Sequence, residues 1–320
     1  MTGTDPLPWL LEADNPSARY LALTRLLDLP ADDPDAISAR AAIPRWGSAR
    51  AILDAQWPQG YWISPGVGYS PKHKATVWQV IFLAAMGTPC TDTIERACAY
   101  LLEHSRLPDG RFSAQKTARG ACPCLNGNLL RAMSQLGYTD PRLAESMGGF
   151  AETLLRDGFR CRCNAAGVEE GPPPARMGDG LPCAWGAIKS LGAFAEIPVE
   201  RRSSTVAAAV DSGIGLLLEG DLPTGDYLTA TKPSPLWQRF GFPLGYTSDL
   251  LEALEVLVRL GMGSHPRLAP AVEIVRSKRD SSGRWALEYT PRNTWASFGK
   301  LGTPNKWVTL RALWVLKHQE

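Results

Sequence analysis

The stretch that decides the fold is Gln56–Trp62, which reads Gln-Trp-Pro-Gln-Gly-Tyr-Trp and follows a helical segment. Its glycine, Gly60, allows the positive φ of a tight turn, and the aromatic ring that follows can fold back over the end of the preceding helix. A glycine followed by an aromatic residue recurs after predicted helices at 108–112, 157–159 and 280–285. This repetition predicts an array of similar helical units.

Two kinds of helix alternate between these turns. The first kind has a broad apolar face, as in Leu250–Val258, where apolar residues recur at helical spacing. The second kind often begins at Pro or Asp, which suits a helix N-terminus. The first kind is predicted at 16–28, 75–86, 125–136, 184–195, 248–260 and 306–317, and the second at 43–56, 91–104, 141–156, 199–219 and 266–279. The chain is therefore predicted to be all-α.

Gln56–Trp62 fits the motif Q-x-x-x-G-x-W. With its alternating helix pairs, the chain resembles the terpenoid cyclase and protein prenyltransferase families, whose squalene cyclase-type repeats close into an α/α toroid, and it is similar to a group of uncharacterised bacterial proteins of that class. The resemblance covers residues 16–320. It implies a single α/α toroid of about five to six inner/outer helix pairs at 16–320, preceded by an N-terminal extension at 1–15. The copies at Gly110 and Gly283 lack the Gln, and the repeat pattern alone also allows another helical repeat array.

The composition bounds the class of protein. The 320 residues carry a net charge of +2 with 44% hydrophobic and 21% charged residues, which excludes a disordered chain and gives no case for nucleic acid. The N-terminus lacks the basic start and apolar stretch of a signal peptide. The longest apolar run, 77–87, is shorter than the roughly 20 residues of a transmembrane helix. The sequence predicts a soluble cytoplasmic protein with no transmembrane segment, and it leaves the oligomeric state open.

In a toroid, the loops that precede the inner helices gather at one mouth, so their residues become neighbours. These loops are long, at 62–74, 112–124, 160–183, 221–247 and 285–305. Long loops in compact domains are commonly functional. We therefore expect binding and catalytic residues in them.

Five of the seven cysteines fall in two adjacent loops of this set. Zinc takes three or four Cys, His or carboxylate ligands, with thiolates favoured. The pattern predicts a zinc site, and the candidate ligands are Cys122, Cys124, Cys161, Cys163 and Cys183.

A structural zinc that ties the two loops together is the leading interpretation, because four thiolates leave no open coordination position. A catalytic zinc is the second, and disulfides, metal-free thiols or an iron–sulfur site are the third. Lantibiotic cyclases and protein prenyltransferases use zinc to activate a thiol, with a His among the ligands. Here Ala184 follows Cys183 and no His occurs in these two loops, which weakens the catalytic interpretation.

Two residues are candidates for acid–base catalysis. Asp249 stands at the first turn of a predicted inner helix, where it is either a helix-start charge, with Ser248 or Thr247 as the cap, or a buried acid that donates a proton. The D-x-D-D motif of squalene-type cyclases is absent. His73 is a candidate general base, although a single His is also typical of a surface.

Basic and aromatic residues near the inner-helix starts form the third set. Converging cations favour a diphosphate or carboxylate, and aromatic rings hold apolar or cationic groups. Solvated loop charges and ordinary packing are the alternatives. The substrate-binding candidates are Lys72, Lys74, Trp78, Trp185, Trp237, Arg239, Tyr246, Trp295, Lys306 and Trp307.

The leading functional prediction is an enzyme that binds an apolar substrate in the central cavity, of isoprenoid type or with an anionic head, for cyclisation or group transfer. The alternatives are a non-catalytic zinc-stabilised binding scaffold and zinc-dependent thiol chemistry of the kind that lantibiotic cyclases perform. An enzyme should contain a closed, ligand-sized pocket lined by Trp, Asp249 and cations. A scaffold should have a filled centre and an exposed apolar patch.

Overall fold

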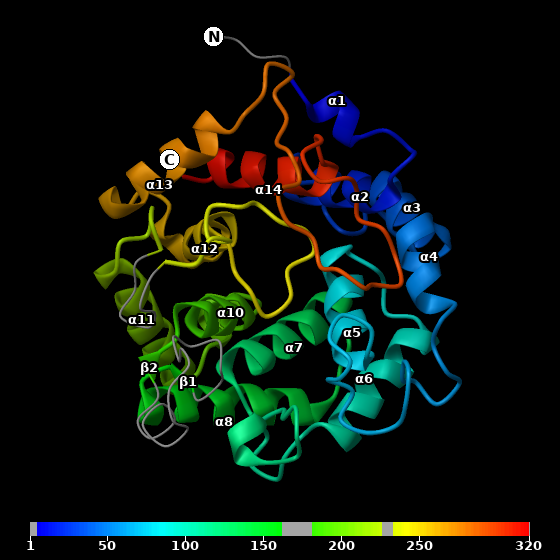
Figure 1. Ribbon diagram of the computed structural model, residues 1–320, viewed down its shortest axis with the longest axis vertical. Helices are drawn as coiled ribbons and strands as arrows, with labels where there is room; N and C mark the ends of the chain where they lie inside the picture. The colour runs from blue at the N-terminus through cyan, green and yellow to red at the C-terminus, as the bar shows by residue number, and fades with distance from the viewer. Residues whose placement is uncertain (1–4, 162–180, 226–232, 320) are drawn as a thin grey trace.

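The computed structural model describes residues 5–161, 181–225 and 233–319. Helices make up nearly all of the regular structure in these ranges (Figure 1). The one sheet among them pairs β1 (Arg160–Cys161) with β2 (Leu181–Pro182) in antiparallel fashion. The predicted all-α class is confirmed. No helix within the described ranges is long and apolar enough to cross a membrane.

Six of the described helices form a closed inner ring. Successive helices pack against one another from α5 through α7, α10, α12 and α14 to α2. The ring closes between α2 and the end of α5, where the Ser17 hydroxyl donates to the carbonyl of Met86 at 2.7 Å. Figure 1 shows these helices around a common centre. They are α2 (Pro16–Arg25), α5 (Thr76–Ala85), α7 (Pro123–Leu136), α10 (Ala184–Phe194), α12 (Leu250–Leu257) and α14 (Lys306–Lys317).

An outer layer of helices surrounds the ring, and each outer helix packs against at least one inner helix. The toroid of inner and outer helix pairs is therefore present. The outer helices are α3 (Pro34–Ala42), α4 (Gly47–Leu53), α6 (Asp92–His104), α8 (Pro141–Asp157), α11 (Ser204–Glu219) and α13 (Ala269–Ser277). Short helical turns complete the described chain: α1 (Leu7–Leu10), η1 (Ile43–Arg45), η2 (Ala118–Gly120), η3 (Val199–Arg201), η4 (Val258–Met262) and η5 (Pro266–Leu268).

The repeated glycine turns have the predicted backbone. Gly60, Gly110, Gly158 and Gly283 all have positive φ, at 95°, 88°, 63° and 79°. At Gly60 a Cβ would lie 2.5 Å from the backbone carbonyl oxygen of Arg96, so only glycine fits between this turn and α6. The turn therefore fixes how closely one repeat approaches the next.

The aromatic residues after these turns cover the ends of the outer helices, as predicted. The indole Nε1 of Trp62 donates to the carbonyl of Ile52 at 2.7 Å, and Trp285 makes the same bond to Val275 at 2.7 Å. Both rings are fully buried. Each bond satisfies a carbonyl in the last turn of the outer helix, a group that has no partner within its own helix.

The N-terminal extension is attached to the ring over its described part. Helix α1 packs against α2 and α14. The Nζ of Lys306, at the start of α14, lies 2.9 Å from a carboxylate oxygen of Glu12 and 2.5 Å from one of Asp14. The extension therefore covers the N-terminal end of one inner helix.

The mouth loops meet at one end of the ring, as expected. Trp295 Nε1 donates to the carbonyl of Lys74 at 2.9 Å, and His73 Nδ1 lies 3.1 Å from the carbonyl of Arg292. The ring of His73 also stacks parallel to that of Tyr246, with centroids 6.4 Å apart. Three loops that are far apart in sequence, at 62–74, 221–247 and 285–305, are thus in contact.

Candidate functional site

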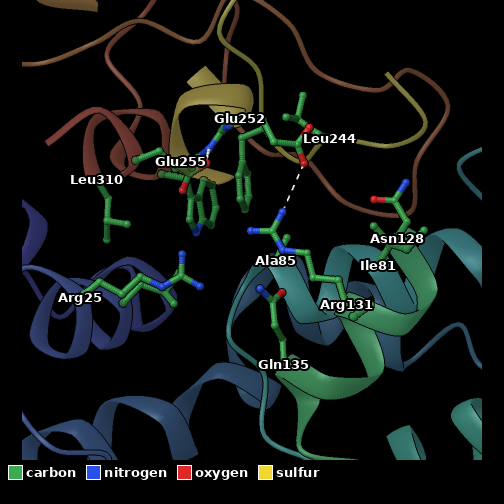
Figure 2. Close-up of a pocket in the computed structure, with 15 residues that line it drawn as sticks. Arg25, Ile81, Ala85, Asn128, Arg131, Gln135, Leu244, Glu252, Glu255 and Leu310 are labelled. Carbon is green, nitrogen blue, oxygen red and sulfur yellow. Dashed lines mark hydrogen bonds and ion pairs between the residues drawn. The ribbon is translucent and has the colours of Figure 1, made fainter. Parts of the chain in front are cut away.

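A cavity of about 80 Å³, partly open to solvent rather than closed, lies within the inner ring. One water molecule needs roughly 10–15 Å³ on this measure, so there is room for several waters or a small organic molecule. The cavity lies between α2, α5, α7, α12, α14 and the loop that precedes α12 (Figure 2). Its apolar lining is Leu21, Ile81, Ala85, Ala132, Phe242, Leu244, Trp307 and Leu310, and its polar lining is Arg25, Asn128, Arg131, Gln135, Glu252, Glu255 and Arg311.

One group of buried charges joins α7, α10 and α12. The Nζ of Lys189 binds both carboxylate oxygens of Glu252, at 2.8 and 2.6 Å. Arg131 Nη1 lies 3.4 Å from the same carboxylate. The Lys189 side chain is 1% exposed. Glu252 therefore lies between two cations at the wall of the cavity.

A second group joins α14 to α12. The guanidinium of Arg311 donates from Nε to Glu255 at 2.6 Å, from Nη2 to Asp249 at 3.2 Å and from Nη1 to the carbonyl of Gly241 at 2.8 Å. These three bonds fix the plane of the guanidinium. Arg311 and Glu255 line the cavity, whereas Asp249 stands behind them.

A third group lies where α10 and α12 end. Glu196 Oε1 accepts from Arg259 Nη1 at 2.6 Å and from Gln135 Nε2 at 2.9 Å. Arg131 Nε is 3.6 Å from the same oxygen and has no hydrogen-bond partner. Arg25, in the last turn of α2, also faces the cavity (Figure 2).

Burial and charge act in opposite directions on these groups. Burial raises the pKa of Asp249 above its ordinary value, although Arg311 opposes the shift. Burial also acts to raise the pKa of Glu255, but Arg311 and Arg131 outweigh it and hold that pKa below its ordinary value. Burial lowers the pKa of Lys189 despite its contact with Glu252. Glu255 is thus held ionised, whereas Asp249 is protonated more easily than an ordinary aspartate.

The local sequence explains why these charges are buried. In α12 (Leu-Leu-Glu-Ala-Leu-Glu-Val-Leu), Glu252 and Glu255 are three residues apart and share a face of a helix whose remaining residues are apolar. In α7, Asn128, Arg131 and Gln135 are three and four residues apart and also share one face. The polar faces of α7 and α12 therefore point to the cavity.

Asp249 is the N-cap of α12. Its carboxylate accepts from the backbone N–H of Glu252 at 2.7 Å and of Gly241 at 2.8 Å, and it is 1% exposed. The predicted helix-start position and burial are both present, but the cap is Asp249 itself rather than Ser248 or Thr247, and Asp249 does not line the cavity. Its contacts with Arg311 and with the loop make it the residue that orients Arg311.

His73 lies in the aromatic cluster at the mouth. Its ring is 5.3 Å from that of Trp78 and stacks on Tyr246. Because the Arg292 carbonyl accepts from Nδ1, the proton lies on Nδ1, and the buried Nε2 has no hydrogen-bond partner. Burial lowers the pKa of His73 below its ordinary value. His73 is therefore a neutral imidazole outside the cavity lining.

The candidate cations of the mouth do not converge on the cavity. The Nζ of Lys72 lies 4.2 Å from the ring centroid of Tyr246, and that of Lys74 lies 4.7 Å from the ring centroid of Trp295. Lys306 binds the N-terminal extension. Arg239 is exposed. These side chains brace the mouth loops.

Most of the candidate tryptophans pack in the mouth. The indole N–H of Trp78 donates to the carbonyl of Tyr69, and that of Trp237 donates to Leu222, each at 2.7 Å. The ring of Trp185 lies 6.4 Å from that of Tyr246. Trp307 alone among the ten substrate-binding candidates lines the cavity, where its ring stacks on Phe242 with centroids 4.4 Å apart.

Three of the five candidate zinc ligands are close together. The side chains of Cys161, in β1, and Cys183, before α10, pack against each other, and Cys122, before α7, packs on both. The Sγ of Cys183 also accepts from the backbone N–H of Gly186 at 3.3 Å. Cys163 lies outside the described residues. Within those residues, no group of three or more His, Cys, Asp or Glu has metal-binding geometry.

No protein-family model matches the chain, and no curated protein is similar to it in sequence.

Most residues of the cavity come from the bodies of the inner helices, where sequence reasoning did not place the site. Arg25, Arg131 and Arg311 line the cavity, and Lys189 stands behind it as the partner of Glu252. All four lie in inner helices. A charged residue inside an apolar helical stripe is the signal that could have found them, because such residues are rarely buried unless they are paired. The described parts of three long loops meet instead at one end of the ring.

Proposed function

We propose that this toroid is an enzyme that binds a small molecule with an apolar part and an anionic group in its central cavity, and that it catalyses a cyclisation or a group transfer. One observation carries the proposal. The centre of the ring holds a cavity whose lining combines apolar side chains with ionised groups. A site of this mixed character is typical of small-molecule binding.

Buried charges favour an enzyme over a scaffold. Desolvating ionised groups costs free energy that their mutual attraction only partly offsets, so folding alone gives little reason to place them here. Perturbed carboxyl pKa values, such as those of Asp249 and Glu255, are typical of catalytic sites. A non-catalytic binding scaffold remains the alternative, and turnover separates the two.

The cavity residues have distinct roles in this proposal. Trp307 and Phe242 form the flat apolar wall. Glu252 and Glu255 are the carboxylates that face the ligand, and their contacts with Lys189 and Arg311 fix their positions. Asp249 is a positioning residue for Arg311, and its raised pKa also suits the proton donor that the sequence predicts.

We also propose that zinc braces the mouth. Cys122, Cys161 and Cys183 bring three thiols from two loops into one place, a donor set that suits a thiolate-bound structural zinc. Cys124 or Cys163 would be the fourth ligand. Zinc would there tie the start of α7 to the start of α10. The alternative for this metal is thiol activation of the lantibiotic cyclase kind. It requires a zinc with an open coordination position.

The experiment that tests the enzyme proposal starts from the small molecules that copurify with the protein. Purified protein is denatured, and released small molecules are identified by mass spectrometry. The recovered compounds are then incubated with fresh protein and with Glu255→Gln, and products are followed. We expect turnover by the wild type and its loss in the variant. A ligand that binds and is never converted would favour the scaffold.

A further inference from the structure

Arg25 is a cation with no partner inside the ring. Its guanidinium lines the central cavity, and it makes no hydrogen bond or salt bridge with any described residue. Figure 2 shows it reaching in from α2, on the side opposite Asn128 and Arg131 of α7. Burial lowers its pKa, but an arginine keeps its proton in proteins.

The neighbouring carboxylates are already engaged. Glu255 and Glu196 attract Arg25 from a distance, while Arg259 and Arg131 repel it. Glu255 is bound by Arg311 at 2.6 Å, and Glu196 by Arg259 at 2.6 Å. Neither carboxylate is within salt-bridge distance of Arg25.

Counting the charges around the cavity gives a small positive excess. Five cations are arranged with four carboxylates, and protonation of Asp249 would only increase the difference. One negative charge is therefore missing among the described groups. The cations are Arg25, Arg131, Lys189, Arg259 and Arg311, and the carboxylates are Glu196, Asp249, Glu252 and Glu255.

We propose that the cavity binds the monovalent carboxylate of a small organic acid, and that Arg25 is its anchor. This inference rests on the proposed function and names the substrate class of the same site. A guanidinium matches a carboxylate by two parallel hydrogen bonds. The apolar residues of the cavity lining, among them Leu21, Ile81 and Leu310, receive the rest of the molecule.

The same charges disfavour a diphosphate. Glu252 and Glu255 face the cavity, and each would repel a second or third negative charge on the ligand. One unpaired guanidinium compensates a single charge. A carboxylate therefore fits where a polyanion does not.

The test uses the full chain and compares three ligand types by calorimetry and thermal denaturation. Butyrate and benzoate are the carboxylates, butyramide and benzamide their neutral counterparts, and inorganic pyrophosphate the polyanion. The variants are Arg25→Gln and Arg25→Lys. The matched control is Arg19→Gln, which removes a cation from the same helix at a site that faces Asp35 on the surface.

We expect the carboxylates to bind the wild type and Arg19→Gln alike, and to bind Arg25→Gln roughly tenfold more weakly or worse. Arg25→Lys should retain part of the affinity. Amides and pyrophosphate should bind more weakly than the carboxylates. Without ligand, the Tm of Arg25→Gln should not fall, because the change removes an uncompensated charge.

Equal carboxylate affinity in Arg25→Gln, or tighter binding of pyrophosphate or of the amides, overturns the proposal. So does a clear fall in Tm of ligand-free Arg25→Gln, which would mean that Arg25 is already satisfied. The enzyme proposal can fail independently of the anion site. If carboxylates bind through Arg25 but are never converted, the anion site is supported and the enzyme proposal is not. Conversely, turnover of a neutral substrate supports the enzyme and overturns the anion site.

Discussion

Arg311 and Asp249 meet inside the ring, with Nη2 of the guanidinium 3.2 Å from Oδ1 of the carboxylate and both side chains buried. Asp249 is also the cap of α12, and Arg311 belongs to α14. The same guanidinium binds Glu255, six residues further along the chain in α12. The pair therefore couples the packing of two inner helices to the position of a carboxylate that faces the cavity.

Replacing Arg311 should be strongly destabilising. Arg311→Leu leaves the carboxylates of Glu255 and Asp249 buried without their main partner, and loss of one member of a buried ion pair costs about 3–5 kcal/mol. Urea denaturation measures the change. Arg50→Ala, which breaks an exposed ion pair with Asp54, is the control and should have little effect. If Arg311→Leu lost no more unfolding free energy than the control, the buried ion pairs assigned to Arg311 would be contradicted.

Substitution by alanine at two helical glycines should change the stability of the protein in opposite directions. At Gly127 in α7, a Cβ would lie 2.3 Å from the backbone carbonyl carbon of Lys189 in α10, so Gly127→Ala must push two inner helices apart. Overpacking of this kind costs about 1–3 kcal/mol. At Gly148 in α8 nothing lies within 4 Å of the new methyl group.

Gly148→Ala should therefore stabilise the protein by roughly 0.5–1 kcal/mol, because alanine loses less backbone entropy in a helix. Thermal denaturation of the two variants beside the wild type compares the signs directly. If Gly127→Ala were as stable as Gly148→Ala, the inner helices would not be in the close contact described.

A third prediction concerns the tryptophan that follows the Gly60 turn. Trp62→Phe keeps an aromatic ring but removes the indole N–H that satisfies the carbonyl of Ile52. A buried acceptor left without a partner costs about 1–3 kcal/mol. The control is Trp57→Phe in the same motif, where the side chain is 52% exposed and the change should stay within about 0.5 kcal/mol. Chemical denaturation tests both, and equal effects would show that ring volume alone matters.

The fold was predictable because its signals are local and repeated. Glycine turns, the following aromatic ring and apolar helical stripes appear in the sequence at the positions where the structure has them. Helix α3 was missed although Asp33 precedes Pro34, the same signal that marks α8 at Asp140 and Pro141. No helix was predicted between 28 and 43, because this segment is rich in Pro and Asp, which are also typical of turns.

The site was less predictable because its residues are joined by contacts of long sequence separation. Lys189 and Glu252 are 63 residues apart, and Arg311 and Asp249 are 62 apart. No pattern in the sequence pairs these charges, and a lysine or glutamate in a helix is ordinarily solvated. Only the closure of the ring shows that they face the same space.

Zinc in the mouth is testable by metal analysis. We expect about one zinc per chain in the purified protein, and a clear loss of zinc in Cys122→Ser, Cys161→Ser and Cys183→Ser, because each removes a thiolate ligand. Cys98→Ala is the control: this thiol is buried in α6, and burial raises its pKa far above the ordinary value, so it remains protonated. Chelation should lower the Tm of the wild type. Absence of zinc from protein prepared with the metal supplied would exclude the proposed brace.

Asp249→Asn separates a structural role from proton donation. Asparagine keeps a side-chain oxygen for the N–H of Glu252, so the helix cap remains, but it removes the charge that faces Arg311. Glu255 still pairs with Arg311 in the variant, so folding should survive.

The pH dependence of stability tests the direction of the Asp249 pKa shift. Because burial raises the pKa of Asp249 in the folded protein, the native state binds more protons than the unfolded state just above the ordinary value of 3.8. The stabilisation from this group is present below that value and is lost as the pH rises through the folded-state pKa. Asparagine has no such titration, so the stability of Asp249→Asn relative to the wild type should improve from pH 3 to pH 7. A difference that does not change with pH would contradict the raised pKa. Once a substrate is identified, full turnover by this variant would assign Asp249 to positioning alone, since an asparagine cannot donate the proton.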